Sequence, residues 1–287
     1  MNEGFFSLKE RLKIIKGDKI TIRGLLSKIH SLRRDLEMWE KVSFDFIREG
    51  FNHESTCSKY ERAVFKIGLW NSEKIMFTKY FRTTDSILDI GCGAGRTTVG
   101  LYNLGYRNIQ GIDLSDAMVE RALTISRTHK IPVKYQRGNA MNMEFEDESF
   151  NGAIFSFNGI MQIPGRKNRE EALSEIRRIL KPGGIFIFTT HDRRDLNFAP
   201  FWASQELIWR NNLQDKRLME YGDMIVKKED EELELYVHIP EREDVKALVA
   251  EAGFELVECV SRDAICIETD ETMRFSNNCV FWVIRKM

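Results

Sequence analysis

The chain is short of the features that mark secreted, metal-binding or membrane proteins. Its five cysteines, at positions 57, 92, 259, 266 and 279 of 287, are scattered and form no C-x-x-C pair. We therefore predict no disulfide framework, no metal site and a reduced, cytoplasmic protein. No apolar run approaches the roughly 20 residues of a membrane span. The start lacks the long apolar stretch of a signal peptide.

Charge of one sign is also missing. The net charge is −1, which provides no overall field for attracting nucleic acid. Apolar residues make up 43% and charged residues 30% of the chain. These shares are typical of a globular protein that can bury a core.

The most informative segment is the run of residues 87–95, Ile-Leu-Asp-Ile-Gly-Cys-Gly-Ala-Gly. A short apolar strand carries Asp89 and then breaks into Gly91, Gly93 and Gly95, after which a helical pattern begins at Arg96. A dinucleotide fingerprint, G-x-G-x-x-G, would need a third glycine at position 96. An acid beside the turn would repel a diphosphate, whereas it suits a ligand with a positive charge, such as a zwitterionic amino-acid group.

Asp113 is the second feature of this kind. It follows the strand-like residues 108–112, 18 residues beyond Gly95. An acid at the carboxyl end of such a strand can accept hydrogen bonds from two ribose hydroxyls. The alternative is an ordinary helix N-cap ahead of Ser115 and Asp116. With the glycine turn upstream, ribose binding is favoured, and an amino-acid group plus a ribose indicates S-adenosylmethionine.

Four segments in order carry a resemblance to the class I S-adenosylmethionine-dependent methyltransferases, in particular those of the ubiquinone-biosynthesis type. They are Leu88-Asp89-Ile90-Gly91-Cys92-Gly93-Ala94-Gly95, Gly111-Ile112-Asp113-Leu114-Ser115, Gly138-Asn139-Ala140 and Ile179-Leu180-Lys181-Pro182-Gly183-Gly184. The resemblance covers about residues 80–191. The ordered set is specific for the fold and the cofactor, but no segment names the substrate.

The third segment departs from the family pattern, which has Gly-Asp-Ala there. The acid would accept a hydrogen bond from the adenine amino group, and the carbonyl oxygen of Asn139 can do the same without the charge. The alternative is that Asn139 only caps the turn that runs to Met143.

The glycine turn, Asp113 and the resemblance together give a set of predicted cofactor-binding residues. They are Asp89, Gly91, Cys92, Gly93, Gly95, Asp113, Leu114, Asn139, Ala140, Met141, Phe157 and Asn158.

The predicted fold is α/β, a Rossmann-like, doubly wound sheet of seven strands in residues 81–191 and 240–287. Strands at 86–90, 108–112, 132–136, 152–157 and 184–190 alternate with helices at 95–104, 115–129 and 168–180. Alternation at this spacing indicates right-handed βαβ units and a parallel sheet. Lys181-Pro182-Gly183-Gly184 is interpreted as a helix stop and a tight turn. A helix at 241–252 and strands at 254–260 and 279–285 follow, and the resemblance implies that the last strand is antiparallel.

Two segments outside the core are expected to shape the acceptor site. Residues 1–80 form a helical N-terminal cap, mildly basic over 5–41, where a solvated face is favoured over contact with RNA or an anionic membrane. Residues 192–239 form a lid with a helix from Pro200 and a hairpin of Tyr221–Lys228 and Leu233–Ile239. The alternative for the lid is that its aromatic residues only anchor it to the core.

The sulfonium methyl is already electrophilic, so the protein must chiefly align the acceptor and exclude water. A general base helps only where the acceptor starts protonated. Residues after the fourth and fifth strands and in the caps are the candidates, with His191 favoured because a histidine pKa lies near neutrality. A loop histidine without a catalytic role is the alternative. The other candidates are Asn158, Gln162, Asp192 and Tyr221, with His53 and His238 behind them.

Three functions fit the sequence. Transfer of a methyl group to a small-molecule acceptor agrees with the near-neutral charge and the aromatic lid. An RNA acceptor, such as tRNA contacted through the basic N-terminal segment, is the second hypothesis. A protein that binds the cofactor without catalysis is the third. After the fourth strand the chain reads Ser156-Phe157-Asn158-Gly159, without the Asn/Asp-Pro-Pro-aromatic segment that grips a flipped base, which argues against a DNA adenine methyltransferase.

Overall fold

A computed structural model describes residues 40–228 and 233–287. The chain divides into two compact units, each described here by itself. The larger unit, which we call the core unit, consists of residues 43–193 and 222–287. The other contains residues 194–221 together with the described residues before position 43. The basic segment 5–41 lies almost entirely outside the described residues.

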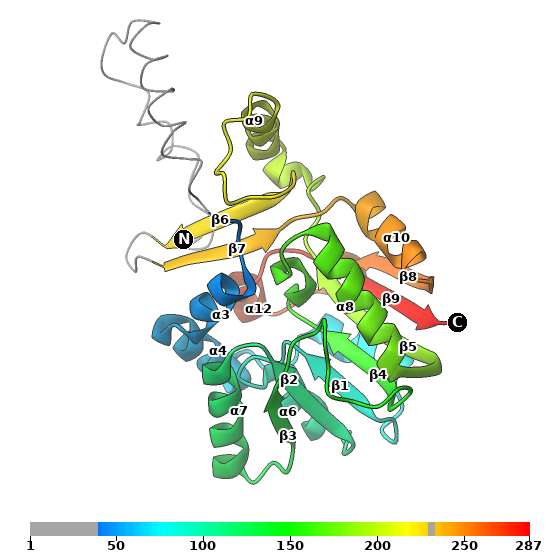
Figure 1. The fold of residues 1–287 in the computed structure, drawn as a ribbon. Helices are drawn as coiled ribbons and strands as arrows, with labels where there is room; N and C mark the ends of the chain where they lie inside the picture. Colours follow the sequence, from blue (N-terminus) through cyan, green and yellow to red (C-terminus); the bar gives the residue numbers. More distant parts are fainter. Residues whose placement is uncertain (1–39, 229–232) are drawn as a thin grey trace, which may run out of the picture. The chain divides into compact units, whose positions relative to one another are not determined.

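The core unit is built on one seven-stranded sheet (Figure 1). The strand order is β3 (Lys134–Arg137), β2 (Ile109–Asp113), β1 (Ile87–Ile90), β4 (Phe150–Phe155), β5 (Leu180–Thr190), β9 (Val280–Lys286) and β8 (Phe254–Ser261). The first five strands are parallel, and β9 is antiparallel to both β5 and β8. The predicted Rossmann-like sheet and its antiparallel last strand are confirmed.

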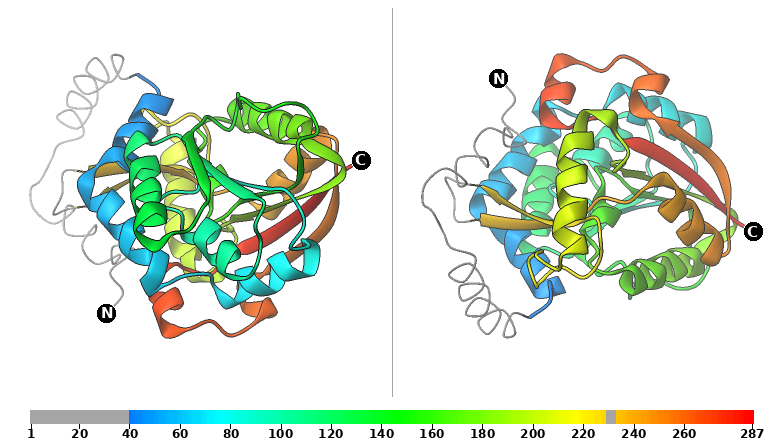
Figure 2. Two further views of the ribbon diagram at one scale, coloured as in Figure 1. Left: turned by 90° about the horizontal axis from the view of Figure 1, so that it is seen from below. Right: turned by 90° about the horizontal axis from the view of Figure 1, so that it is seen from above.

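Helices cover both faces of this sheet (Figures 1 and 2). From the centre, β1 leads to β2 through α6 (Arg96–Asn103), and β2 leads to β3 through α7 (Asp116–His129). In the opposite direction, β4 leads to β5 through α8 (Arg166–Ile179). Right-handed crossovers that run in opposite directions place their helices on opposite faces. The central strands are therefore buried on both sides, and every residue of β1 is buried.

In the described part of the chain, three helices precede the sheet. They are α3 (Phe44–Asn52), α4 (Glu54–Lys66) and α5 (Asn71–Tyr80). Ser43 caps α3 by accepting a hydrogen bond from the Phe46 N–H, and His53 caps α4 by accepting one from the Ser55 N–H. The helices α3 and α4 lie against α6 and α7, next to the carboxyl ends of β1 and β2.

The segment from Lys181 to Gly184 differs from the prediction. The helix ends at Ile179 as expected, but β5 begins at once, with Leu180 paired to Phe150 and Ile185 paired to Gly152. The residues between these two pairs form a bulge in which Gly183 has a φ of +76°. The bulge inserts the turn residues into the strand instead of placing them before it.

The predicted lid is divided between the two units. Its hairpin, β6 (Asp223–Lys228) and β7 (Leu233–His238), forms a separate antiparallel pair within the core unit. The strand β7 lies against α3 and against η2, a short 3₁₀ helix at Gly159–Gln162. Between β7 and β8 lies α10 (Arg242–Glu251), and between β8 and β9 lie α11 (Arg262–Ile265) and α12 (Asp270–Phe275), the last two not expected from the sequence.

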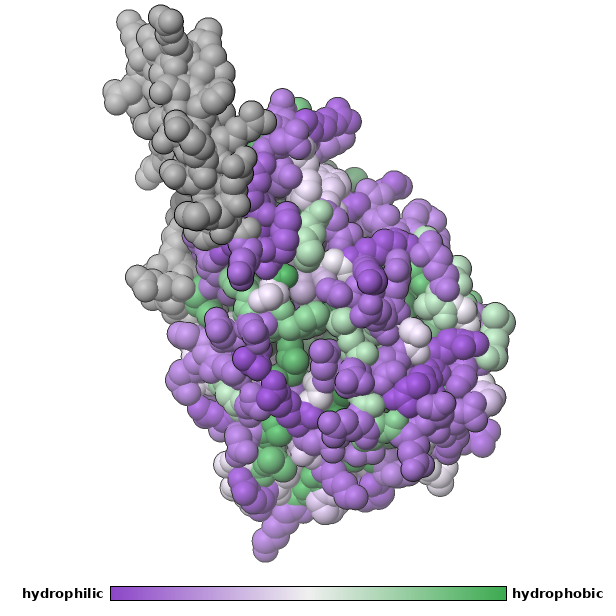
Figure 3. All heavy atoms as spheres, viewed as in Figure 1, coloured by the Kyte–Doolittle hydropathy of each residue, from purple (hydrophilic) through white to green (hydrophobic). Residues whose placement is uncertain are grey.

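The smaller unit holds η3 (Leu196–Phe198) and α9 (Ala199–Arg210). Edge-to-face contacts join Trp202 and Trp209 to Tyr221, with ring centroids 6.0 and 6.1 Å apart. Within this unit the aromatic residues thus anchor the helix to the chain that follows it. No helix in the described part of the chain is long and apolar enough to cross a membrane. The face drawn in Figure 3 is mostly hydrophilic, with apolar side chains surfacing in separate patches.

Candidate functional site

A pocket opens in the core unit where β1 and β4 end. These two strands are neighbours, but the chain leaves β1 toward β2 and leaves β4 toward β5. Such a switch of direction leaves a crevice at the carboxyl ends of the strands, which is where ligands bind in open α/β sheets. The turn after β1 supplies Gly91 and Gly93 to the pocket, and the turn after β4 supplies Phe157 and Gly159.

The glycine turn needs its glycines for two physical reasons. Gly91, Gly93 and Gly95 all have positive φ, at +61°, +55° and +94°, a region that side chains disfavour. A Cβ on Gly91 would lie 2.4 Å from Cε2 of Phe155. The turn therefore brings bare backbone to the pocket wall, and Gly95 then starts α6 as its N-cap. Backbone at a helix N-terminus is suited to the carboxylate of an amino-acid ligand.

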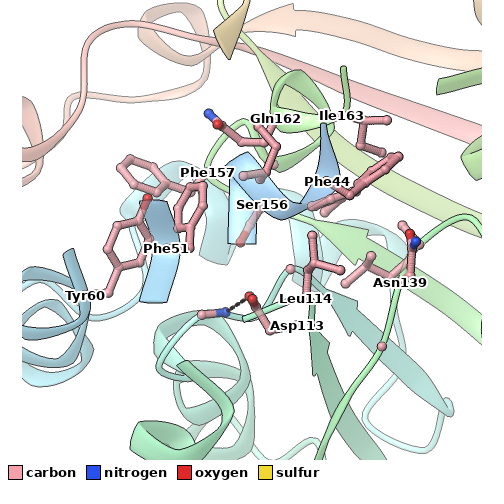
Figure 4. Close-up of a pocket in the computed structure, with 18 residues that line it drawn as sticks. Phe44, Phe51, Tyr60, Asp113, Leu114, Asn139, Ser156, Phe157, Gln162 and Ile163 are labelled. Carbon is pink, nitrogen blue, oxygen red and sulfur yellow. Dashed lines mark hydrogen bonds between the residues drawn. The ribbon is translucent and has the colours of Figure 1, made fainter. Parts of the chain in front are cut away.

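Asp113, the last residue of β2, lies beside the glycine turn. Its Oδ2 accepts a hydrogen bond of 2.8 Å from the Gly93 N–H, and its Oδ1 accepts one of 2.8 Å from the Ser115 N–H. Figure 4 shows the carboxylate at the base of the pocket. Each carboxylate oxygen keeps a lone pair for a further donor, so a ribose diol can be accommodated without breaking either bond.

Burial raises the pKa of Asp113 to about 6, although hydrogen bonds from Ser115, Gly93 and Leu114 oppose the shift. A ligand whose hydroxyls donate to the carboxylate binds the ionised form. We therefore expect the affinity for S-adenosylmethionine to be constant above pH 7 and to fall about tenfold between pH 7 and pH 5 as the carboxylate takes up a proton. Calorimetric titrations across this range measure the effect.

The matched control for this pH dependence is Asp113→Asn, which cannot titrate. Its weaker affinity should stay flat from pH 8 to pH 5. A wild-type affinity that is equally flat would contradict the assignment of Asp113 to the ribose.

Asp89 and its neighbours lie behind the pocket wall. Asp89 is fully buried, and its Oδ2 accepts a hydrogen bond of 2.6 Å from the Thr98 hydroxyl. Its Oδ1 has no hydrogen-bond partner among the described residues, and burial raises its pKa to about 7. Cys92 is also buried, 2.8 Å from the position of a Cβ on Gly111. Neither Asp89, Cys92 nor Gly95 lines the pocket; they shape the turn that does.

The predicted adenine side also forms part of the wall. Leu114, Asn139 and Ala140 line the pocket, whereas Met141 does not. The Oδ1 of Asn139 accepts a hydrogen bond of 3.0 Å from the Met141 N–H. The capping contact thus exists, and the second lone pair of that oxygen stays available for an adenine amino group.

An apolar wall closes the pocket, and sequence reasoning missed most of it. Phe44, Ile47 and Phe51 of α3 line it together with Tyr60 of α4. The Tyr60 ring contacts Phe51 and Phe157 edge to face, with centroids 5.9 and 5.7 Å apart. The signal for α3 was its spacing of apolar residues at 44, 47 and 51, which is helical. Nothing in that spacing says that the stripe faces a ligand.

The structure separates the candidate catalytic residues. Gln162 lines the pocket, whereas Asn158 and His191 do not. The Nδ1 of His191 hydrogen-bonds the Asn278 carbonyl at 2.9 Å, and its Nε2 lies 3.3 Å from Nδ2 of Asn158. Both ring nitrogens of His191 are therefore engaged, and direct proton abstraction by this residue stays a prediction.

The remaining candidates have partners elsewhere. Asp192 accepts a hydrogen bond from Arg242, and His238 is bonded to Asp223 on the hairpin. His53 is a helix cap. Tyr221 belongs to the smaller unit, where its hydroxyl donates to the Trp202 carbonyl.

With this geometry in view, comparisons with known proteins give a consistent result. Residues 87–184 match the family model described as "Methyltransferase domain". The demethylmenaquinone methyltransferase of Symbiobacterium thermophilum is 31% identical over 160 residues, which are 53% of this chain and 58% of that protein. A sterol 24-C-methyltransferase of Yarrowia lipolytica is 30% identical over 198 residues, 64% of this chain and 48% of that protein.

The chain thus spans about half the length of these relatives. A solved S-adenosylmethionine-dependent methyltransferase from Methanosarcina mazei shares the fold, with a TM-score of 0.62 and 22% identity over 77% of this chain and 99% of that one. Its likeness and the matched segment agree with the sheet order and the glycine turn described above. The matched segment, the relatives and the shared fold together support a class I S-adenosylmethionine-dependent methyltransferase.

Proposed function

We propose that the protein transfers the methyl group of S-adenosylmethionine to an apolar small-molecule acceptor bound in the core-unit pocket. The observation that carries the proposal is the apolar character of the side chains in the pocket wall that faces the cofactor side. These side chains belong to Phe44, Ile47, Phe51 and Phe157, and among the described residues that line the pocket Asp113 is the one acidic residue. Such a wall favours a planar or aliphatic acceptor over a phosphate-bearing one.

Residues at the carboxyl ends of β1, β2 and β3 would hold the cofactor. Asp113 would accept the ribose hydroxyls, Leu114 and Asn139 would contact the adenine, and the Gly91–Gly93 backbone would contact the amino-acid group. When bound, the cofactor supplies an electrophilic methyl group. The remaining task of the protein is to align the acceptor and keep water out, which the apolar wall serves. The names of two relatives, acting on demethylmenaquinone and on a sterol, agree with an apolar acceptor.

The test is incubation of the full chain with methyl-labelled cofactor and two separate lysate fractions, one of organic-extractable small molecules and one of bulk tRNA. We expect label to enter the organic-extractable fraction and the tRNA to stay unlabelled. Asp113→Ala protein provides the blank, because it retains the acceptor wall and loses the ribose contact.

Two outcomes would contradict the proposal. Label confined to the tRNA would identify a tRNA methyltransferase instead. Cofactor binding with no transfer to either fraction would indicate a binding protein without catalysis.

A further inference from the structure

The pocket offers no basic side chain to the carboxylate of an amino-acid ligand. Among the described residues that line it, none is a lysine, an arginine or a histidine. The guanidinium of Arg96 lies over the Phe157 ring, but it does not line the pocket and is paired with Glu73. A carboxylate that leaves water without hydrogen bonds is costly. The pocket must therefore supply neutral donors, and the backbone of the glycine turn is one source of them.

Tyr60 lies directly against that turn. A Cβ on Gly93 would be 3.2 Å from Cδ1 of Tyr60, so the ring covers the backbone of the turn. Edge-to-face contacts with Phe51 and Phe157 hold the Tyr60 ring in place. Figure 4 shows these three rings together, across the pocket from Asn139 and therefore away from the predicted adenine side. Tyr60 is thus a neighbour of the amino-acid end of the cofactor site.

The hydroxyl group of Tyr60 is accessible within an enclosed space. It has no hydrogen-bond partner among the described residues, but it is not one of their fully buried unpaired atoms, so it keeps accessible surface. Burial raises the pKa of Tyr60 well above its usual value, which means that the hydroxyl does not face open solvent. Since Tyr60 lines the pocket, the enclosed space is the pocket. The other hydroxyl of the pocket wall, that of Ser156, already lies 2.7 Å from the Thr97 hydroxyl.

We propose that the Tyr60 hydroxyl donates a hydrogen bond to the carboxylate of the amino-acid group of S-adenosylmethionine. The inference rests on the proposed function, which places that group on the Gly91–Gly93 backbone. The backbone contacts the group from one side and the phenol of Tyr60 contacts it from the other. A hydrogen bond to an ionised acceptor is stronger than one between neutral groups, so the phenol takes the place of a basic residue.

Removal of this hydroxyl should affect the ligand and spare the fold. In the protein without ligand the hydroxyl has no partner to lose, and Tyr60→Phe keeps the ring and its contacts with Phe51 and Phe157. We therefore expect the Tm of Tyr60→Phe without ligand to stay within about 2 °C of that of wild type. Thermal unfolding of both proteins measures this.

The test compares two ligands that differ only in the carboxylate. They are S-adenosylhomocysteine and its decarboxylated counterpart, which keeps the adenosine, the sulfur and the amine. Binding of each to the full chain is measured by calorimetry, and the preference is the ratio of the two dissociation constants. We expect this preference for the carboxylate to be about tenfold smaller in Tyr60→Phe than in wild type, through weaker binding of S-adenosylhomocysteine alone.

Tyr102→Phe is the matched control. It makes the same chemical change at a half-buried tyrosine of α6 that does not line the pocket. This variant should keep the wild-type dissociation constants for both ligands, and hence the wild-type preference for the carboxylate.

The outcomes separate this inference from the function on which it rests. A preference unchanged in Tyr60→Phe, or an equal loss of affinity for both ligands, would overturn the contact between Tyr60 and the carboxylate while leaving the cofactor site intact. Failure of wild type to bind S-adenosylhomocysteine at all would overturn the proposed function as well.

Discussion

Replacing Asp113 with alanine is expected to weaken binding of S-adenosylmethionine about 100-fold. The carboxylate is placed to accept two ribose hydroxyls, and a hydrogen bond to a charged group contributes about 1.5 kcal/mol or more. Loss of two such bonds amounts to about 3 kcal/mol, or about two orders of magnitude in affinity. The substitution also leaves the Gly93 N–H and the Ser115 N–H without their present acceptor, which loosens the turn.

Calorimetry with the cofactor and with S-adenosylhomocysteine measures the loss. Asp116→Ala is the matched control, because Asp116 is an acid three residues further along that pairs with Arg137 on the surface. The Asp116→Ala variant should bind the cofactor with an affinity within about twofold of that of wild type. Thermal unfolding of both variants establishes that they are folded at the assay temperature. If the Asp113→Ala protein binds the cofactor as tightly as wild type does, the assignment of Asp113 to the ribose is wrong.

The second large effect concerns the ion pair at the start of α6. Arg96 and Glu73 are joined by two hydrogen bonds of 2.6 Å, and both side chains are buried. Arg96 also donates to the Gly68 carbonyl and lies over the Trp70 ring. In Arg96→Met the carboxylate of Glu73 would stay buried without its counter-ion. We expect the free energy of unfolding to fall by about 3 to 5 kcal/mol.

A double-substitution cycle shows where this loss comes from. Arg96→Met combined with Glu73→Gln removes both charges. The glutamine can still accept the hydrogen bond that Glu73 receives from the backbone N–H of Trp70. The double variant should recover most of the loss. Arg121→Met is the surface control, since Arg121 pairs with Glu54 and Glu61 at about one-third exposure. It should cost about 1 kcal/mol or less in urea unfolding. Equal costs for Arg96→Met and Arg121→Met would contradict the assignment.

The sequence is a good guide to the sheet because the relevant signals are local. The segments predicted as strands, from 86–90 to 279–285, match the observed strands to within a few residues. The exception is β5. Its pairing continues through Gly183 and Gly184 because a bulge absorbs them, and a bulge depends on the partner strand β4.

The pocket is harder to predict because its wall comes from side chains distant in sequence. The turn at 91–95 and Asp113 are next to their strands, so their place at the sheet edge follows from the motif. Phe44 and Phe51 reach the pocket only because α3 packs on α7 and β7. His191 was chosen for its intrinsic pKa alone, whereas its hydrogen bonds, to Asn158 and Asn278, depend on residues distant in sequence.

The antiparallel strand β9 has a consequence for synthesis of the chain. It lies between β5 and β8, yet it follows every other strand in the sequence. While the ribosome adds residues 191–279, the apolar edge of β5 has no partner, and β8 has no sheet to join. An unpaired apolar edge of this kind can pair with other chains. The nascent protein thus carries an unpaired edge on β5 until β9 is synthesised. Aggregation through this edge is most favoured in that period.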